Sequence, residues 1–403
     1  MSELFKSKKK LGMMVGAIFL SLTLVAGGVA GILLNTAWGS ALAPDKPESS
    51  QPAEEETGPE DLDKLLPAEL EPEPEPENIE PVYHVPGEMR GVYLVPGYDF
   101  LTDLNAGEGA IRAEIDKAVE KAAELTMNSV IIDTVYNDKV IFETSGAPRL
   151  DAGFDVMEYV VDAARKQGLY VYSIFDASLF QEKSGGASLA LGAGTIDKLT
   201  ANLREFAEKY APDAILIDGY TQPADEEQTY IRYLMTGGAI GYNNFLRQTP
   251  AAVVRNMSNT IRQYTPNIQV GLLADAIWAS ADEQEGGLPV QSASYSSLGN
   301  GNADTKAFVE DGVVDFVAVK AFSSLTDPNE PFETVVTWWA DVARRSGVPM
   351  YVVHASSKVC TQNAGWGSYD QLTRQVIRAS GLPGYSGSVF DSLSRLVANP
   401  QDA

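Results

Sequence analysis

From residue 88 onward, short apolar runs alternate with longer amphipathic segments, and this unit repeats eight times. Enrichment of the short runs in Val, Ile, Phe and Tyr predicts strands, and a helical period predicts helices between them. The predicted strands are residues 91–95, 129–133, 169–176, 214–218, 269–275, 316–321, 350–355 and 387–391. The predicted helices are residues 110–126, 155–167, 196–210, 249–264, 304–311, 332–346 and 368–380, and a last short helix begins near Ser392.

Eight strand–helix units over residues 88–403 predict an α/β fold, the (β/α)8 TIM barrel. The ends of two helices support the boundaries, because Gly168 and Gly347 each follow a turn that carries basic residues. A doubly wound open sheet is the alternative. No glycine-rich phosphate loop follows the first strand, and this favours the barrel.

A different pattern precedes this domain. Residues 1–10 carry four lysines and predict a cytoplasmic basic tail, and residues 11–34 contain no charged residue. A helix of that length, at about 1.5 Å per residue, spans a bilayer core of about 30 Å, so we expect a single-pass transmembrane signal anchor in the cell membrane. A cleaved signal peptide is the alternative, because residues 41–43 (ALA) resemble a cleavage site.

Residues 35–87 predict a disordered acidic linker. Fourteen acidic residues and two lysines fall within residues 44–80, and residues 71–77 read EPEPEPE. Proline and like charges keep such a chain extended, so we expect a spacer that holds residues 88–403 outside the cytoplasm.

The overall composition excludes several classes of function. A net charge of −25 argues against binding of nucleic acid, because phosphate backbones repel an acidic protein. One cysteine and two histidines exclude an internal disulfide, cysteine-based zinc sites and most histidine-rich metal centres. We therefore expect no cofactor and no metal.

Polar residues stand at the carboxyl ends of the predicted strands, where barrel enzymes place their chemistry. These residues are Asp133, Asp176, Asp218, Asp275, Lys320, His354 and Asp391. Each also has a structural interpretation: a carboxylate can cap the following helix, and a lone histidine can be a buried, hydrogen-bonded side chain. A ring of aspartates also suits Mg²⁺ or Ca²⁺.

Paired carboxylates are the groups that cleave glycosidic bonds, one as proton donor and one as nucleophile or base. We predict Asp218 as a catalytic residue, with Asp133, Asp176 or Asp275 as its partner. Aromatic rings bind sugar faces, and polar groups bind sugar hydroxyls. The predicted substrate contacts are Tyr220, Trp278, Lys320, His354 and Trp366.

Several segments match a known pattern in order and spacing: residues 89–93, 214–220, 270–278, 315–318, 338–342, 351–355 and 387–390. This pattern resembles the glycosyl-hydrolase-like family 10 domain of bacterial envelope proteins. The resemblance covers about residues 88–398 and implies a barrel that acts on glycans, with peptidoglycan as the polymer for some members.

The sequence departs from that family at the strand ends. Asp218 matches the first residue of the family's Asp-Asp-Tyr motif, but Gly219 replaces the second. Asp133, Asp176 and Lys320 replace the residues usual at the second, third and sixth strands. Two hypotheses follow: a diverged hydrolase, or a glycan-binding or scaffolding barrel that has lost catalysis.

Overall fold

The computed structural model describes residues 84–180, 183–184, 187–188, 193–221, 226–290, 295–363, 365–368 and 370–398. The predicted basic tail, the predicted membrane helix 11–34 and all of the predicted linker before residue 84 lie outside these residues. Among the described residues, no helix combines the length and the apolar character needed to cross a membrane.

Eight parallel strands close into a barrel, which confirms the predicted fold. The strands are β1 (Met89–Leu94), β2 (Ser129–Ile132), β5 (Tyr170–Asp176), β8 (Ala214–Asp218), β9 (Gln269–Asp275), β10 (Phe316–Lys320), β11 (Met350–Ala355) and β12 (Tyr385–Asp391). Neighbours in the barrel are also neighbours in this order, and β12 pairs with β1 to close the ring.

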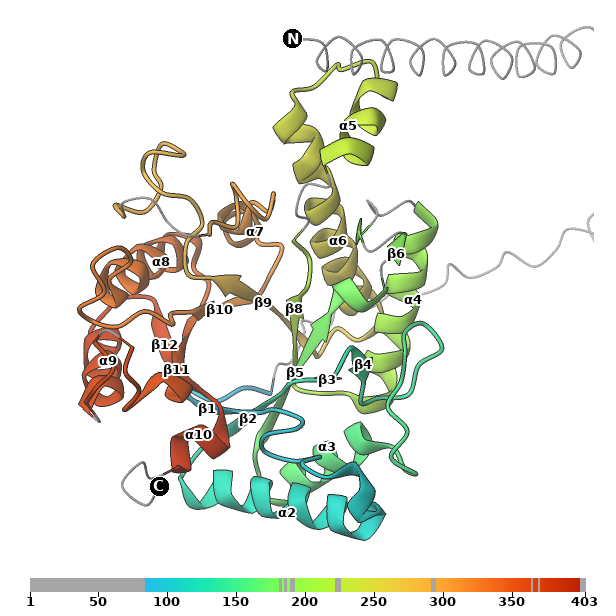
Figure 1. The fold of residues 1–403 in the computed structure, drawn as a ribbon, viewed down its shortest axis with the longest axis vertical. Coiled ribbons are helices and arrows are strands. Elements are labelled where there is room, and N and C mark those ends of the chain that lie inside the picture. The colour runs from blue at the N-terminus through green and yellow to red at the C-terminus, as the bar shows by residue number, and fades with distance from the viewer. Residues whose placement is uncertain are drawn as a thin grey trace, which may run out of the picture. The chain divides into compact units, whose positions relative to one another are not determined.

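Helices lie outside the ring of strands (Figure 1). They are α2 (Glu108–Glu124), α3 (Val156–Lys166), α4 (Ala193–Tyr210), α5 (Glu226–Met235), α6 (Tyr242–Tyr264), α7 (Thr305–Glu310), α8 (Phe332–Ser346), α9 (Asp370–Ser380) and α10 (Leu393–Val397). Each predicted helix is present. Helix α5 and two small hairpins, β3–β4 (Val135–Tyr136 with Lys139–Val140) and β6–β7 (Lys183–Ser184 with Ala187–Ser188), were not predicted.

The barrel interior is filled by side chains from alternate residues of each strand, because successive side chains of a strand point to opposite faces. This inner core consists of Met89, Tyr93, Ile131, Tyr172, Ile174, Ala214, Leu216, Leu273, Phe316, Ala318, Tyr351, Val353 and Val389. Gly271 leaves space for the large ring of Phe316, since a Cβ there would lie 2.2 Å from the ring. The interior is therefore packed, and any ligand must bind at a mouth.

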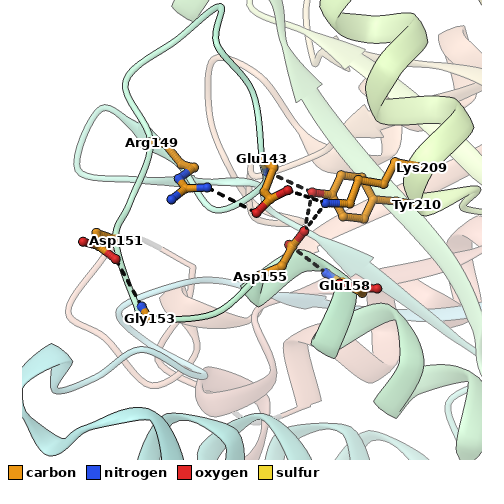
Figure 2. A network of polar contacts seen from close by, with 8 residues as sticks. All are labelled: Glu143, Arg149, Asp151, Gly153, Asp155, Glu158, Lys209 and Tyr210. Carbon is orange, nitrogen blue, oxygen red and sulfur yellow. Dashed lines mark hydrogen bonds and ion pairs between the residues drawn. The ribbon is translucent and has the colours of Figure 1, made fainter.

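A polar network fastens the segment that connects β2 to α3 (Figure 2). Lys209 of α4 donates to Glu143 at 2.6 Å and to Asp155 at 2.7 Å, and Glu143 also pairs with Arg149 at 3.4 Å. The Tyr210 hydroxyl donates to Asp155 at 2.8 Å. These contacts hold the long loop that follows the end of β2 against α4.

Candidate active site

Six of the predicted polar residues meet at one mouth of the barrel. Each lies two residues after a side chain of the inner core, so the alternation along the strand directs it toward the barrel axis. All six are half-buried. They are Asp133, Asp176, Asp218, Asp275, Lys320 and Asp391.

Asp176 and Asp218 are direct partners in the register of β5 and β8. Neighbouring strands lie about 4.8 Å apart, so these two carboxylates stand side by side. The Ser178 N–H donates to Asp176 Oδ1 at 2.8 Å, and the Gly219 N–H donates to Asp218 Oδ1 at 2.8 Å. Each carboxylate is thus fixed by the backbone of the loop that follows its strand.

Gly219 makes this pair possible. Its φ is +65°, and a Cβ built on it would lie 1.8 Å from Asp176 Oδ1 and 2.7 Å from the Ser178 nitrogen. The Asp176 carboxylate therefore occupies the space that a side chain at residue 219 would need. Gly219 and Asp176, at the ends of neighbouring strands, therefore form one structural unit.

The environment of the mouth favours protonated carboxyl groups. Burial raises the pKa of Asp133 to about 6, and the charges of Asp218, Asp176 and Asp391 add to this effect. Burial also raises the pKa of Asp218; the nearby charge of Lys320 opposes this, and that of Asp176 reinforces it. Proton donors and ionised carboxylates can therefore coexist at this mouth at mildly acidic pH.

Lys320 forms an ion pair with Asp275, its register partner on β9, with Nζ 2.7 Å from Oδ1. Burial by itself lowers the pKa of Lys320, but the carboxylates of Asp218 and Asp275 outweigh it and raise the pKa above its usual value. Asp275 is thus engaged by a cation, whereas Asp176 lies directly beside Asp218. Of the predicted partners for Asp218, the geometry favours Asp176.

The prediction that His354 contacts substrate is wrong. His354 alternates with the inner-core residues Tyr351 and Val353 and points away from the barrel axis, where it is fully buried. Its Nδ1 lies 3.0 Å from Gln375 Oε1 and its Nε2 lies 2.9 Å from Ser388 Oγ. Burial lowers its pKa to about 4, so it is a neutral, hydrogen-bonded core residue.

Tyr220 and Trp278 are also not the sugar-stacking rings that we expected. Tyr220 is 2% exposed and its hydroxyl donates to the Leu273 carbonyl at 2.9 Å. Trp278 is 5% exposed and stacks on Trp338, with ring centroids 5.6 Å apart. Both rings are packed within the core, so neither presents a face to a ligand.

Trp366 is buried, but it lines a pocket of about 390 Å³ that also includes Lys320. Phe322 and Lys358 line the same pocket, and the Lys358 ammonium donates to the Phe322 carbonyl at 2.9 Å. Phe322 is half-buried and packs on the inner core. This pocket extends the mouth beyond Lys320 and combines aromatic with polar groups, as sugar subsites do.

Sequence reasoning missed two tyrosines of the mouth. Tyr93 is 7% exposed, belongs to the inner core, and has a pKa raised by burial and by the charges of Asp391, Asp218 and Asp133. Tyr295 is 40% exposed, and burial and the charge of Asp275 raise its pKa. Neither tyrosine could be predicted from the residues that end the strands, because Tyr93 lies within a strand and Tyr295 lies in a long loop.

The Mg²⁺ or Ca²⁺ alternative has no support in the described part of the chain. There, no three side chains from His, Cys, Asp and Glu are grouped so that they could hold a metal ion.

No family model matches the chain. It is 22% identical over 365 residues to the glycosyl hydrolase DigH of Escherichia coli O6:H1, an alignment that covers 75% of this chain and 82% of DigH. It is 19% identical over 361 residues to the glycosyl hydrolase YngK of Bacillus subtilis, which covers 78% of this chain and 69% of YngK.

Solved structures share the fold. The PgaB (BpsB) glycoside hydrolase domain from Bordetella bronchiseptica matches with a TM-score of 0.56 and 12% identity, covering 78% of this chain and 96% of that domain. The catalytic domain of β-amylase from Paenibacillus polymyxa matches with a TM-score of 0.50 and 11% identity, covering 76% and 92%. These structures show the shared fold, and the two curated relatives make the domain glycosidase-like; its assignment to family 10 stays a prediction.

Proposed function

We propose that this chain is a membrane-anchored glycoside hydrolase that works outside the cytoplasm on cell-wall or related polysaccharide. Its similarity to two proteins named glycosyl hydrolases supports the reaction class. The four lysines that precede the uncharged residues 11–34 support the anchor, and the acidic linker suits a spacer between membrane and barrel. The resemblance to an envelope family supports a cell-wall substrate.

The observation that carries this proposal is the pairing of Asp176 with Asp218 at the mouth. Asp218, whose pKa is raised by burial, protonates the leaving glycosidic oxygen. Asp176, held by the Ser178 N–H, attacks the anomeric carbon as that carbon–oxygen bond breaks. Asp218 then removes a proton from the water that hydrolyses the glycosyl ester, and the two carboxyls return to their starting states.

The strand spacing suits this double displacement. Carboxyl groups about 5–5.5 Å apart retain the anomeric configuration, whereas a separation of about 6.5–9.5 Å leads to inversion. Asp176 and Asp218 project to the same side from register positions on strands about 4.8 Å apart, and this backbone spacing is compatible with the shorter separation. Lys320 and Tyr295 interact electrostatically with Asp218, and Phe322 lines the pocket beside Lys320, so these groups are placed to bind the sugar rings next to the cleaved bond.

The test is the stereochemistry of cleavage by the full chain on cell-wall polysaccharide, followed by NMR of the newly formed reducing ends. We expect products that keep the configuration of the cleaved bond. Azide should restore turnover to the Asp176→Ala variant, since it can replace a missing nucleophile. Inverted products would contradict the assignment of Asp176, and glycan binding with no turnover would favour the alternative of a binding domain.

A further inference from the structure

One side of the mouth takes no part in the proposed reaction. It consists of Tyr93 on β1 with the two carboxylates beside it, Asp391 at the end of β12 and Asp133 after β2. The three belong to adjacent strands, because β1 pairs with both β12 and β2. We call these three residues the Tyr93 side of the mouth.

The Tyr93 hydroxyl lacks a hydrogen-bond partner. The residue is 7% exposed, and its hydroxyl oxygen is among the buried polar atoms of the described residues with no such contact. Buried polar groups are nearly always hydrogen-bonded, so an unpaired hydroxyl at a site mouth points to a ligand. Pairing of β1 with β12 and β2 places Tyr93 between the strands that end at Asp391 and just before Asp133, and the charges of these carboxylates help to raise the pKa of its hydroxyl.

The negative charge of the mouth is less compensated by cations on the Tyr93 side. Lys320 pairs with Asp275 on the far pair of strands, β9 and β10. Arg395 acts electrostatically on Asp391, but its guanidinium carbon lies 5.3 Å from the centroid of the Tyr98 ring, over its face. A neutral ligand would leave Asp133 and Asp391 repelling each other, whereas a cationic group would offset that repulsion.

The cation that fits is an ammonium group. The carboxylates in the described residues are not grouped to coordinate a metal ion. An ammonium has three N–H donors, which can reach two carboxylates and the Tyr93 oxygen at once. In a glycan, this group occurs on an amino sugar that carries no N-acetyl group.

We propose that the Tyr93 side of the mouth binds the ammonium group of an amino sugar, so that the protein selects glycans with free amino groups over their N-acetylated forms. This inference rests on the proposed function and narrows its substrate. It also disfavours glycans rich in carboxylate, sulfate or phosphate, since the aspartates would repel them.

Binding can be measured with the full chain carrying Asp218→Asn, a change that we expect to suppress turnover. The probes are a hexasaccharide of glucosamine and a hexasaccharide of N-acetylglucosamine, compared by calorimetry at low and high salt. We expect the glucosamine probe to bind at least about tenfold more tightly, with a preference that shrinks as salt rises. Equal affinities, tighter binding of the acetylated probe, or binding of neither would overturn the inference.

Variants separate this role from a structural one. In the same background, Asp391→Asn and Tyr93→Phe should each reduce the preference several-fold, and Asp213→Asn at the opposite end of β8 should leave it unchanged. Without ligand, Tyr93→Phe should keep the melting temperature, because it removes an unpaired hydroxyl. A lower melting temperature with an unchanged preference would assign Tyr93 a packing role and contradict the inference.

Turnover of the same probes by the unmodified chain distinguishes the two proposals. Preferential binding of the glucosamine probe with no cleavage of any glycan would remove the proposed hydrolase function and leave the inference standing. Cleavage of both probes without preference would support the proposed hydrolase function and overturn the inference.

Discussion

Asp133 shows how the mouth shifts the balance between the charged and neutral forms of a carboxyl group. Its Oδ1 accepts from the Val135 N–H at 3.0 Å, which favours the ionised form, yet burial and three neighbouring carboxylates raise its pKa to about 6. Ionisation of this group therefore works against the folded state. The cost is about 3 kcal/mol for a pKa that moves from 3.8 to about 6.

This cost gives stability a defined pH dependence. Between pH 4 and 6 the native state binds more protons at Asp133 than the unfolded state, so its contribution to the free energy of unfolding falls as pH rises. We predict that Asp133→Asn stabilises the protein by up to about 3 kcal/mol at pH 8 and by little at pH 4. Urea unfolding of both proteins at the two pH values measures this, and an equal difference at both would contradict it.

The strand-end rule predicted the placement of a polar side chain well where the residue lies in phase with the inner core. Asp176 and Asp218 follow Ile174 and Leu216 by two residues, so both the position and the direction of each side chain were correct. His354 follows Val353 by one residue and so points outward. The alternation of side chains along a strand can be read from the sequence, and it distinguishes the inward aspartates from the outward histidine. The packing of Trp278 on Trp338 could not be predicted in this way, because it depends on tertiary contacts that no local pattern encodes.

At the scale of elements, the turn after β8 couples two strands. Gly219 adopts φ +65° and leaves room for the carboxylate at the end of β5. Gly312 adopts the same φ, but a Cβ there would meet nothing within 4 Å. The two glycines therefore share the backbone requirement and differ only in what surrounds them.

This pair gives a matched test. We predict that Gly312→Ala costs about 1 kcal/mol in stability, the ordinary penalty for a side chain at positive φ, and leaves turnover unchanged. Gly219→Ala should cost more, and should lower turnover on the order of a hundredfold by displacing Asp176. Thermal unfolding and glycan hydrolysis measure both effects, and equal behaviour of the two variants would show that Asp176 does not depend on Gly219.

Element types and order were predictable because each strand and helix carries its own period. The boundaries of the elements were less predictable: α6 begins at Tyr242 and not near residue 249, and Pro250 lies within the helix. Helix α5 and the two hairpins belong to loops above the barrel, where the sequence carries no repeating pattern. These loops border the mouth, so the sequence predicts the scaffold better than the surface that selects a ligand.

At the scale of the whole molecule, the barrel is closed by contacts between its first and last units. Asp99, which follows β1, accepts from the Val95 N–H at 2.7 Å and from the Ser394 N–H of α10 at 2.6 Å. The ring of strands is completed by β12 pairing with β1. Both kinds of contact lie within the barrel.

The predicted linker should therefore add nothing to the stability of the barrel. Deletion of residues 46–80 should change the melting temperature by less than a few degrees, since a segment rich in Pro and Glu buries little apolar surface. Calorimetry of the full and shortened chains measures this. A larger decrease would mean that the linker packs on the barrel.

The most direct test of the account is the turnover of Asp218→Asn, compared with that of Asp213→Asn just before the same strand. Asp213 precedes β8 at the opposite end of the barrel and accepts from the Val171 N–H at 2.7 Å. With both variants shown to be folded by circular dichroism, we predict that Asp218→Asn lowers glycan hydrolysis on the order of a hundredfold to ten-thousandfold and that Asp213→Asn keeps it. Full hydrolysis by Asp218→Asn, or an equal loss in both variants, would contradict a catalytic mouth built on Asp218.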